Sequence, residues 1–357
     1  MKNVRIKDIA LKAKVSTGTV DRVLHNRGKV SEVIKQRILK VIDEMNYEPN
    51  LMARALVSTK TYKIAVLIPD YFIEPYWDAH KSGIENAEKE LKKYRVSVSF
   101  FAFNPYEAES FIAKAKELTD SKPDGILLSP IFYREILPFF EKWKKKEIPF
   151  VLYNTHITEH EPLSYIGQDS YQSGLLAGRL VDYGQNDPCS ILIAHIDEDI
   201  SNSAHLIKKE NGFRNFFIQN VLTEKYNIIT TELNRADFAS FTAKLDDVIQ
   251  NTPDLKSIFV TTGKAYEIAA YLEQRGIRNM KIVGYDLLSK NIHFLNKGFI
   301  SFLINQNPTG QGYWGMHYLA RALVFKQEVP RVKYLPLDVV TKENLSYYTD
   351  ENELIGI

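Results

Sequence analysis

The chain has 357 residues, of which 45% are hydrophobic and 25% are charged. This composition excludes a disordered or fibrous chain, and the length exceeds one compact core, so we expect two or three domains. The net charge of +2 is unevenly spread, because residues 1–60 carry 13 Lys and Arg against 6 Asp and Glu. A basic module followed by a mildly acidic body hints at nucleic-acid binding, although a solvated pair of basic helices would look the same.

Neither a membrane segment nor a metal site is expected. No apolar run approaches the roughly 20 residues that a membrane-spanning helix needs, and the charged N-terminus lacks a signal-peptide core. The protein is therefore expected to stay in the cytoplasm. The single cysteine, Cys189, can form neither an internal disulfide nor a cysteine-rich zinc site, so we expect no metal and no cofactor.

Three helical patterns come first along the chain. Apolar residues recur at helical spacing over 6–13, 20–24 and 34–42. Ser16 is a good N-cap, so the second helix should begin at Thr17, about three residues after the first helix ends. Two helices joined by so short a turn predict a helix-turn-helix.

A short segment follows the third helix. Pro49 ends that helix, and Asn50 can cap a new one of about two turns. Isolated helices this short are marginal in water, so the segment should order only when something packs on it.

From Lys63 onward, short β-rich runs alternate with longer amphipathic helices. The runs cover residues 64–68, 96–103, 125–129, 149–153, 190–194, 258–260, 281–285 and 300–304. Such alternation predicts a parallel sheet covered by helices on both faces. Its length exceeds one typical domain and favours two similar lobes.

Two segments carry a family resemblance. The first is IKDIALKAKVSTGTVDRVLHNRGKVSEVIKQRILKVIDEMNYEPNLMARAL, with its V-S turn, T-V-x-R-V-L helix and N-Y-x-P-N lead-in. It resembles the lactose-repressor (LacI) family of bacterial transcription regulators. The second is IAVLIPDYFIEPYWDAHKSGIENA, which resembles the first strand and helix of the sugar-binding periplasmic-protein fold that these regulators carry as a sensor. Together the two segments extend the resemblance over essentially the whole chain.

The resemblance implies a small all-α headpiece and an α/β sensor of two doubly wound parallel-sheet lobes. The expected parts are a DNA-binding headpiece over 1–48, a hinge helix and linker over 49–62, and the two-lobed sensor over 63–341. Lobe 1 should comprise about 63–167 and 307–333, and lobe 2 about 168–306 and 334–347.

The family's recognition helix lies in the major groove, which implies that Thr17, Gly18 and Arg22 face the bases. Arg22 can make the bidentate contact to guanine, or it can touch only phosphate. Asp21 stands where the family usually has a small hydroxyl residue, and it can instead pair with Arg22 or a nearby loop cation. Asn26, Arg27 and Lys29, in the loop after this helix, are either phosphate ligands or simply solvated. The full set of expected DNA contacts is Ser16, Thr17, Gly18, Thr19, Arg22, Asn26, Arg27, Lys29, Asn50, Ala53 and Leu56.

In the hinge, Leu56 matches the leucine that the family wedges into the minor groove, and Ala53 matches the small residue beside it. The alternative for Leu56 is a helix-face leucine that packs on the sensor.

Open parallel sheets bind ligands beyond the carboxyl ends of their strands. That rule selects Tyr76 and Trp77, Asn154 and Thr155, Asp286, and Gln306, and the resemblance points to the same pocket. The aromatic rings would stack on a sugar or polyol, and the polar groups would take its hydroxyls. Tyr76 and Trp77 could instead be core aromatics, and Asp286 could cap the next helix, as we expect Asp169 to cap its own.

Several positions depart from the family's ligand site. Lys209 replaces an arginine and loses its bidentate fork, Thr262 stands in place of an asparagine, and Asn154-Thr155 replaces an aspartate–arginine pair. We therefore expect these residues in the pocket, but with less charge than simple pentose binders have.

Residues 310–315, GQGYWG, match the dinucleotide motif GxGxxG literally. The motif lies in the last βα unit, where no further half remains to complete a dinucleotide site. We interpret its small residues as permitting close helix packing.

The combined expectation is a DNA-binding transcription regulator, with repression favoured, whose operator affinity is controlled by a small carbohydrate or polyol effector between the lobes. The family reads near-palindromic operators with two headpieces, which implies a homodimer. The alternatives are a solute-binding receptor, which would need a signal peptide, and a sugar-processing enzyme on the same fold. No GxSxG elbow or P-loop is present, so we expect no catalytic residues and no enzyme activity.

Overall fold

The computed structural model describes residues 4–24, 27–45, 47, 59–157, 159–197 and 204–349. The chain divides into two units, residues 1–58 and residues 59–357, and each unit has its own hydrophobic core.

The N-terminal unit contains a helix-turn-helix. Its helices are α1 (Ile6–Ala13), α2 (Thr17–Leu24) and α3 (Glu32–Glu44). The predicted start of the second helix at Thr17 is confirmed, because the Oγ of Ser16 accepts a hydrogen bond from the backbone N of Thr19 at 3.2 Å. Each helix contributes to the core, through the fully buried residues Ile9 and Ala13, Val20, and Ile38.

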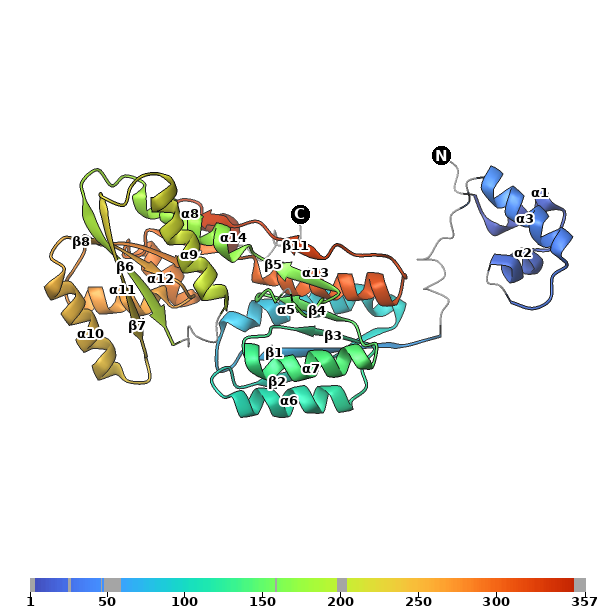
Figure 1. Ribbon diagram of the computed structural model, residues 1–357, viewed down its shortest axis with the longest axis horizontal. Helices are drawn as coiled ribbons and strands as arrows, with labels where there is room; N and C mark the ends of the chain where they lie inside the picture. Colours follow the sequence, from blue (N-terminus) through green and yellow to red (C-terminus); the bar gives the residue numbers. More distant parts are fainter. Residues whose placement is uncertain are drawn as a thin grey trace. The chain divides into compact units, whose positions relative to one another are not determined.

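The larger unit contains two six-stranded sheets, which define two lobes (Figure 1). The sheet of lobe 1 has the strand order β11-β5-β4-β3-β1-β2, and all its pairs are parallel. Its strands are β1 (Tyr62–Pro69), β2 (Val96–Phe103), β3 (Gly125–Leu128), β4 (Phe150–Tyr153), β5 (Ser164–Gly167) and β11 (Val332–Tyr334).

The sheet of lobe 2 has the order β12-β10-β9-β8-β6-β7. Its strands are β6 (Cys189–Ile196), β7 (Tyr226–Leu233), β8 (Leu255–Val260), β9 (Lys281–Tyr285), β10 (Phe302–Asn305) and β12 (Asp338–Val340). The expected parallel sheet is confirmed from β10 to β7, and β12 adds an antiparallel edge strand through its pairing with β10. The strands β5, β7, β11 and β12 are also absent from the predicted set.

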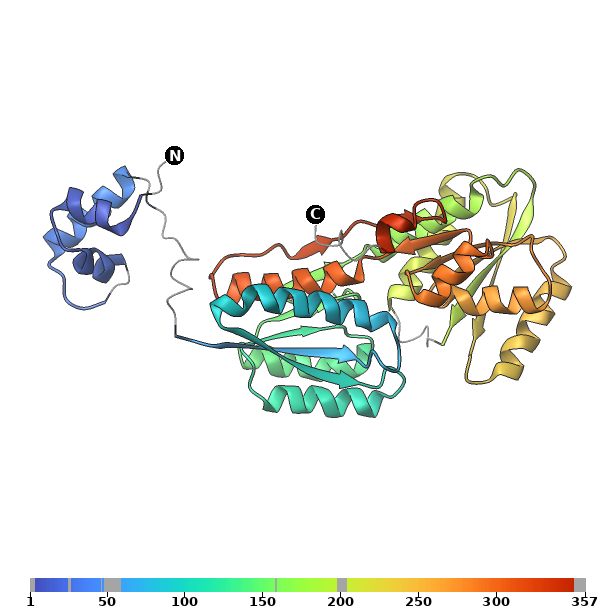
Figure 2. The same cartoon turned by 180° about the vertical axis from the view of Figure 1, so that it is seen from behind.

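Helices cover both faces of each sheet, as the alternation predicts (Figures 1 and 2). Lobe 1 has α5 (Tyr76–Leu91), η1 (Lys92–Tyr94), α6 (Ala108–Asp120), α7 (Tyr133–Lys145) and α13 (Pro308–Leu323). Lobe 2 has α8 (Ser170–Asp182), α9 (Ala204–Gln219), α10 (Phe238–Asn251), α11 (Ala265–Gln274), α12 (Ser289–Asn296) and α14 (Ser346–Thr349). Asp169 caps α8, as predicted, by accepting hydrogen bonds from the backbone N of Tyr171 and Gln172.

Successive side chains of the central strands alternate between the two faces of each sheet, so both faces pack against helices. In β1, Ile64 and Val66 pack with α5 and α13, whereas Ala65 and Leu67 pack with α6 and α7. In β6, alternate residues likewise face either α8 and α9 or α10 to α12. Each central strand is therefore buried on both faces, which explains its continuous apolar sequence.

The chain crosses between the lobes at residues 168–169, 306–307 and 335–337, next to β5, β10, β11 and β12. These strands lie at one side of each sheet, so β2 and β7 lie at the side farthest from the crossings. The crossings and the opposite edges together frame the cleft between the lobes.

Candidate functional site

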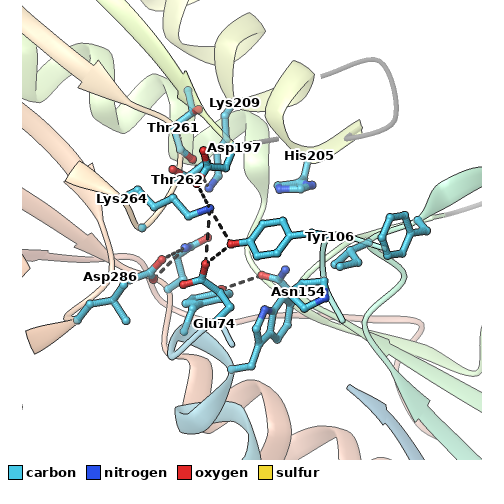
Figure 3. Close-up of a pocket in the computed structure, with 18 residues that line it drawn as sticks. Glu74, Tyr106, Asn154, Asp197, His205, Lys209, Thr261, Thr262, Lys264 and Asp286 are labelled. Atoms are coloured by element: carbon cyan, nitrogen blue, oxygen red, sulfur yellow. Dashed lines mark hydrogen bonds and ion pairs between the residues drawn. The ribbon is translucent and has the colours of Figure 1, made fainter. Parts of the chain in front are cut away.

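A pocket of about 270 Å³ lies between the lobes, at the carboxyl ends of strands from both sheets (Figure 3). This volume is close to the lower end of the roughly 300–1,000 Å³ range of small-molecule sites. The lining residues are Glu74, Tyr76, Trp77, Pro105, Tyr106, Ile131, Phe132, Asn154, Asp197, His205, Lys209, Thr261, Thr262, Gly263, Lys264, Asp286, Leu288 and Gln306.

The structure brings together seven of the eight residues predicted to bind the ligand, namely Tyr76, Trp77, Asn154, Lys209, Thr262, Asp286 and Gln306. Thr155 is the exception. It is buried but does not line the pocket, and its backbone N donates a hydrogen bond to the carbonyl oxygen of Tyr153 at 2.7 Å.

The lobe 1 wall is aromatic and polar at once. The hydroxyl of Tyr76 donates a hydrogen bond to Oδ1 of Asn154 at 2.9 Å, which fixes both side chains at the pocket surface. Trp77 lines the pocket and also belongs to the hydrophobic core of lobe 1. Trp77 is therefore a core aromatic that also contributes surface to the pocket.

Asp286 follows β9 and lies opposite that wall. Its carboxylate accepts hydrogen bonds from Nε2 of Gln306 at 2.9 and 2.8 Å. The alternative role as a helix cap is wrong, because Leu288 occupies the N-cap position of α12. Burial raises the pKa of Asp286 to about 6, although the charge of Lys209 and the hydrogen bonds from Gln306 oppose the shift.

Lys209 is held from two sides by lobe 2. Its Nζ donates a hydrogen bond to the carbonyl oxygen of Thr261 at 3.0 Å and lies 3.6 Å from the centre of the Tyr285 ring. The ammonium group is therefore fixed beneath the pocket. Beside it, Thr262 Oγ1 is buried and has no hydrogen-bond partner within the part of the chain that the structure describes.

The pocket also contains charged residues that the sequence reasoning missed. Glu74, Asp197 and Lys264 line one end, and Lys264 Nζ lies 3.2 Å from Oδ2 of Asp197 and 3.6 Å from Oε2 of Glu74. Burial would raise the pKa of Asp197, but hydrogen bonds from Arg235 and the charge of Lys264 outweigh it and lower the pKa. The expectation of less charge than in simple pentose binders considered only the replaced family positions and did not include these three residues.

The strand-end rule contained the missing signal. Asp197 directly follows β6, Lys264 follows β8, and Glu74 lies in the loop after β1. Tyr106, in the loop after β2, completes this end of the pocket. Applying the rule to every strand would have selected all four residues.

Several of the predicted DNA-facing residues are exposed in the headpiece. Thr17, Gly18, Arg22, Arg27 and Lys29 are exposed. Arg22 Nε donates a hydrogen bond to the carbonyl oxygen of Gly18 at 3.2 Å.

Of the other residues predicted to contact DNA, the structure describes only Ser16 and Thr19. Ser16 and Thr19 hydrogen-bond to each other through their hydroxyls at 2.9 Å, so both serve the start of α2. Asn26, Asn50, Ala53 and Leu56 lie outside the described residues.

Two histidines, His156 and His160, have the i,i+4 spacing that could suggest a metal pair, but they are not on a helix. The ring of His156 stacks on Tyr165 with centroids 4.2 Å apart, and His160 Nδ1 lies 3.5 Å from Oε1 of Glu141. No group of three or more His, Cys, Asp or Glu is arranged to hold a metal within the described ranges. Among those residues, no helix is long and apolar enough to cross a membrane.

Comparisons with known families match both units. A model described as bacterial regulatory proteins, lacI family, matches residues 5–50, and a periplasmic binding protein domain matches residues 64–327.

Among curated proteins, the HTH-type transcriptional regulator MalR of Streptococcus pneumoniae is 30% identical over 48% of this chain and 51% of its own length. The chain thus matches about half the length of that relative. The ribose operon repressor of Halalkalibacterium halodurans is 27% identical over 79% of this chain and 80% of its own length.

Among solved structures, a putative LacI transcriptional regulator from Bacteroides fragilis matches with a TM-score of 0.74 and 30% identity. The match covers 81% of this chain and 100% of that one. A glucose-galactose binding protein from Geobacillus stearothermophilus matches with a TM-score of 0.71 at 23% identity, covering 80% of this chain and 99% of that one, and shares the fold.

Proposed function

Because this chain belongs to the lacI family of bacterial regulatory proteins, we propose that it is a DNA-binding transcriptional repressor controlled by a small carbohydrate or polyol. The effector binds between the two lobes of the sensor, and the headpiece binds operator DNA in the cytoplasm. The pocket carries the proposal, because it combines an aromatic wall with buried hydrogen-bonding groups.

Each part of the pocket suits a polyhydroxylated ligand. The rings of Tyr76 and Trp77 offer apolar surface to a sugar face, and the paired oxygens of Asp286 can accept two hydroxyl protons. Thr262 Oγ1, which is buried without a partner among the described residues, gains one from a ligand hydroxyl. A ligand with hydroxyls on several carbons satisfies these groups at once.

We infer that the protein binds this ligand without transforming it. Several polar groups of the lining act on one another as hydrogen-bonding and ionic partners, and the two curated relatives named above are regulators. Turnover of a bound sugar by the purified protein would contradict this inference.

We further propose that the protein acts as a homodimer on a near-palindromic operator. Two headpieces read two half-sites, with Arg22 on a base edge, Arg27, Lys29 and Asn26 on phosphates, and Leu56 beside Ala53 in the minor groove. Effector binding between the lobes changes the spacing of the two segments that begin at Asn50, which decides whether short helices form there on DNA. Reciprocal coupling of about 1–3 kcal/mol would change operator affinity roughly 5- to 150-fold.

The test begins with a thermal-shift screen of a carbohydrate and polyol library, using the full chain. DNA fragments selected by the protein from a random-sequence pool then serve as the operator probe. Asp286→Ala should abolish the ligand response and leave ligand-free DNA binding nearly intact. Asp254→Ala is the matched control, because Asp254 pairs with Ser190 at the amino ends of the strands, outside the pocket lining. A full ligand response in Asp286→Ala would show that the pocket is misplaced.

A further inference from the structure

One end of the pocket is closed by ionic contacts that join the two lobes. We call Glu74, Tyr106, Asp197, Arg235 and Lys264 the interlobe ion cluster. Glu74 and Tyr106 come from lobe 1, in the loops after β1 and β2, and the other three come from lobe 2, after β6, β7 and β8. Figure 3 shows Tyr106 and Glu74 directed towards Lys264.

The contacts across the lobe boundary converge on one carboxylate. Oε2 of Glu74 lies 3.6 Å from Lys264 Nζ and 3.8 Å from Arg235 Nη2, and it accepts a hydrogen bond from the hydroxyl of Tyr106 at 2.7 Å. The same hydroxyl lies 3.3 Å from Arg235 Nη2 and 3.4 Å from Lys264 Nζ. A single carboxylate of lobe 1 thus faces two cations of lobe 2.

Lobe 2 holds those cations in place. Asp197 accepts hydrogen bonds from the backbone N of Arg235 at 2.7 Å and from its guanidinium group, and it also contacts Lys264. Arg235 Nη1 donates to the hydroxyl of Tyr266 at 2.8 Å. The two cations are therefore arranged within lobe 2 before Glu74 meets them, which lowers the entropic cost of the contact.

Partial burial strengthens these ionic contacts, because it reduces their screening by water and salt. The side chains of Glu74, Asp197 and Lys264 are 12%, 9% and 8% exposed. Exposed ion pairs contribute little, whereas partly buried pairs within a hydrogen-bonded network are screened less by water and salt. If the lobes separated, Lys264 would keep Asp197 but lose Glu74.

The location of the cluster makes it effective. The chain crosses between the lobes near β5, β10, β11 and β12, while the cluster comes from the loops of β1, β2, β6, β7 and β8. The pocket therefore lies between the crossings, where a rotation of one lobe against the other would have its hinge, and the ionic contacts at the other side of both sheets. A contact far from a hinge is stretched by even a small rotation and so resists opening.

We propose that the interlobe ion cluster is a latch that holds the sensor lobes closed in the absence of effector. Closure then precedes binding, and the affinity for the effector depends on the fraction of molecules that the latch keeps closed. This consequence for the effector rests on the function proposed above. The latch itself can be tested without effector or DNA, so the two proposals can fail separately.

The experiment measures the distance between spin labels on the two lobes of the full chain. The labels are attached at Ala113→Cys in α6 and Ala239→Cys in α10, which are exposed positions on the helices that follow Tyr106 and Arg235. The native Cys189 is buried. Dilution of labelled chains with unlabelled ones isolates distances within one chain.

We expect the unmodified sensor to give one short distance and the Glu74 variants to add a longer one. Glu74→Gln removes the charge and should lower the closed-to-open ratio by roughly tenfold, in line with the loss of one charge-assisted hydrogen bond. Glu74→Lys places three cations together and should open the lobes further. Glu85→Lys is the matched control, because Glu85 pairs with Lys81 on the surface of α5 within lobe 1, and it should leave the distance unchanged.

Thermal unfolding of each variant shows that the lobes themselves remain folded. Should Glu74→Lys destabilise lobe 1, the milder Glu74→Gln still reports on the latch. The proposal is overturned if the folded Glu74 variants keep the unmodified distance distribution, or if Glu85→Lys opens the lobes to the same extent.

Discussion

Asp286 and Gln306 form a buried pair in which both carboxylate oxygens accept hydrogen bonds from one amide nitrogen, at 2.9 and 2.8 Å. Both side chains are 3% exposed. Asp286 follows β9 and Gln306 follows β10, so the pair joins two neighbouring strand ends beneath the pocket. The amide can donate only two protons, so the buried carboxylate keeps acceptor capacity for a ligand.

The burial of Asp286 predicts an unusual dependence of stability on pH. The pKa is raised to about 6 from an ordinary value of 3.8, so the folded state binds this proton more tightly than the unfolded state. The stabilisation is fully present below pH 3.8 and is lost as the pH rises to about 6. Asp286→Asn should therefore raise the free energy of unfolding at pH 7.5 by about 1–3 kcal/mol.

Urea denaturation between pH 4 and pH 8 measures this effect. The variant should lose the decline that the unmodified protein shows between pH 4 and pH 6. Asp254→Asn, in the same lobe but at the opposite ends of the strands, should give no such gain. Equal destabilisation by Asp286→Asn at every pH would contradict the assignment.

A second carboxylate, that of Glu210, should give the opposite dependence of stability on pH, because its pKa is lowered. A hydrogen bond with His195 lowers the pKa of Glu210 to about 2, and Arg214 adds to the shift against the effect of burial. The lowered pKa means that the stabilisation exists above pH 4.5, the ordinary value, and is lost as the pH falls towards 2. His195 also hydrogen-bonds the pocket residue Thr261 at 2.9 Å, so this network supports the pocket wall from behind.

Glu210→Gln should therefore destabilise the sensor by about 1–3 kcal/mol at pH 7, because it weakens a charge-assisted hydrogen bond to a buried imidazole. The difference from the unmodified protein should shrink when urea midpoints are compared at pH 3. Glu232→Gln, on the exposed side of β7, is the control and should change neither midpoint. A difference that grows in acid would refute the network.

The match to GxGxxG leads to a packing prediction. A Cβ added at Gly312 would overlap the backbone carbonyl oxygen of His80 on α5, so this glycine permits the close contact of α13 with α5. Backbone cannot give way as a flexible side chain does, so Gly312→Ala should destabilise the sensor by at least about 1–3 kcal/mol.

Gly18→Ala is the matched control for this helix-glycine change, since its new Cβ finds its nearest neighbour, Ser16 Oγ, at 3.9 Å. It should leave the thermal unfolding of the sensor unchanged. A thermal shift with NAD in the unmodified protein would instead support the interpretation of residues 310–315 as a dinucleotide-binding motif.

The strands show which parts of the fold could be predicted from the sequence. The expected limits of β2 and β9 are confirmed, because both runs are rich in β-branched and aromatic residues and each ends before a polar residue, Asn104 or Asp286. The strand β7 was missed because YNIITTEL is half polar, as suits an edge strand with one partner. The three-residue strands β11 and β12 exist through pairing with distant β5 and β10, and such long-range pairing leaves no local pattern.

The pocket residues also divide into those that the sequence predicts and those that it does not. Tyr76, Asn154 and Asp286 follow strands with clear signals, so the strand-end rule selected them. Arg235 follows the missed strand β7, and nothing local indicates that it lies near Glu74, far away in the sequence. That contact depends on how the two lobes meet, which the pattern within either lobe does not encode.

The headpiece allows a direct separation of base recognition from phosphate binding. Arg22 is exposed on α2, and Lys29 is exposed in the loop that follows it. Arg22→Ala should cost about 1–3 kcal/mol on the selected DNA and relax the preference at one base position. Lys29→Ala should weaken binding to all sequences alike and lower the slope of log affinity against log salt by about one.

Lys12→Ala is the control, because Lys12 pairs with Glu44 at 2.8 Å and lies outside the predicted contacts. Fluorescence anisotropy with the selected fragment and a scrambled one, each at several salt concentrations, distinguishes the three variants. Equal losses for Arg22→Ala on both fragments would reassign this residue to the phosphate backbone.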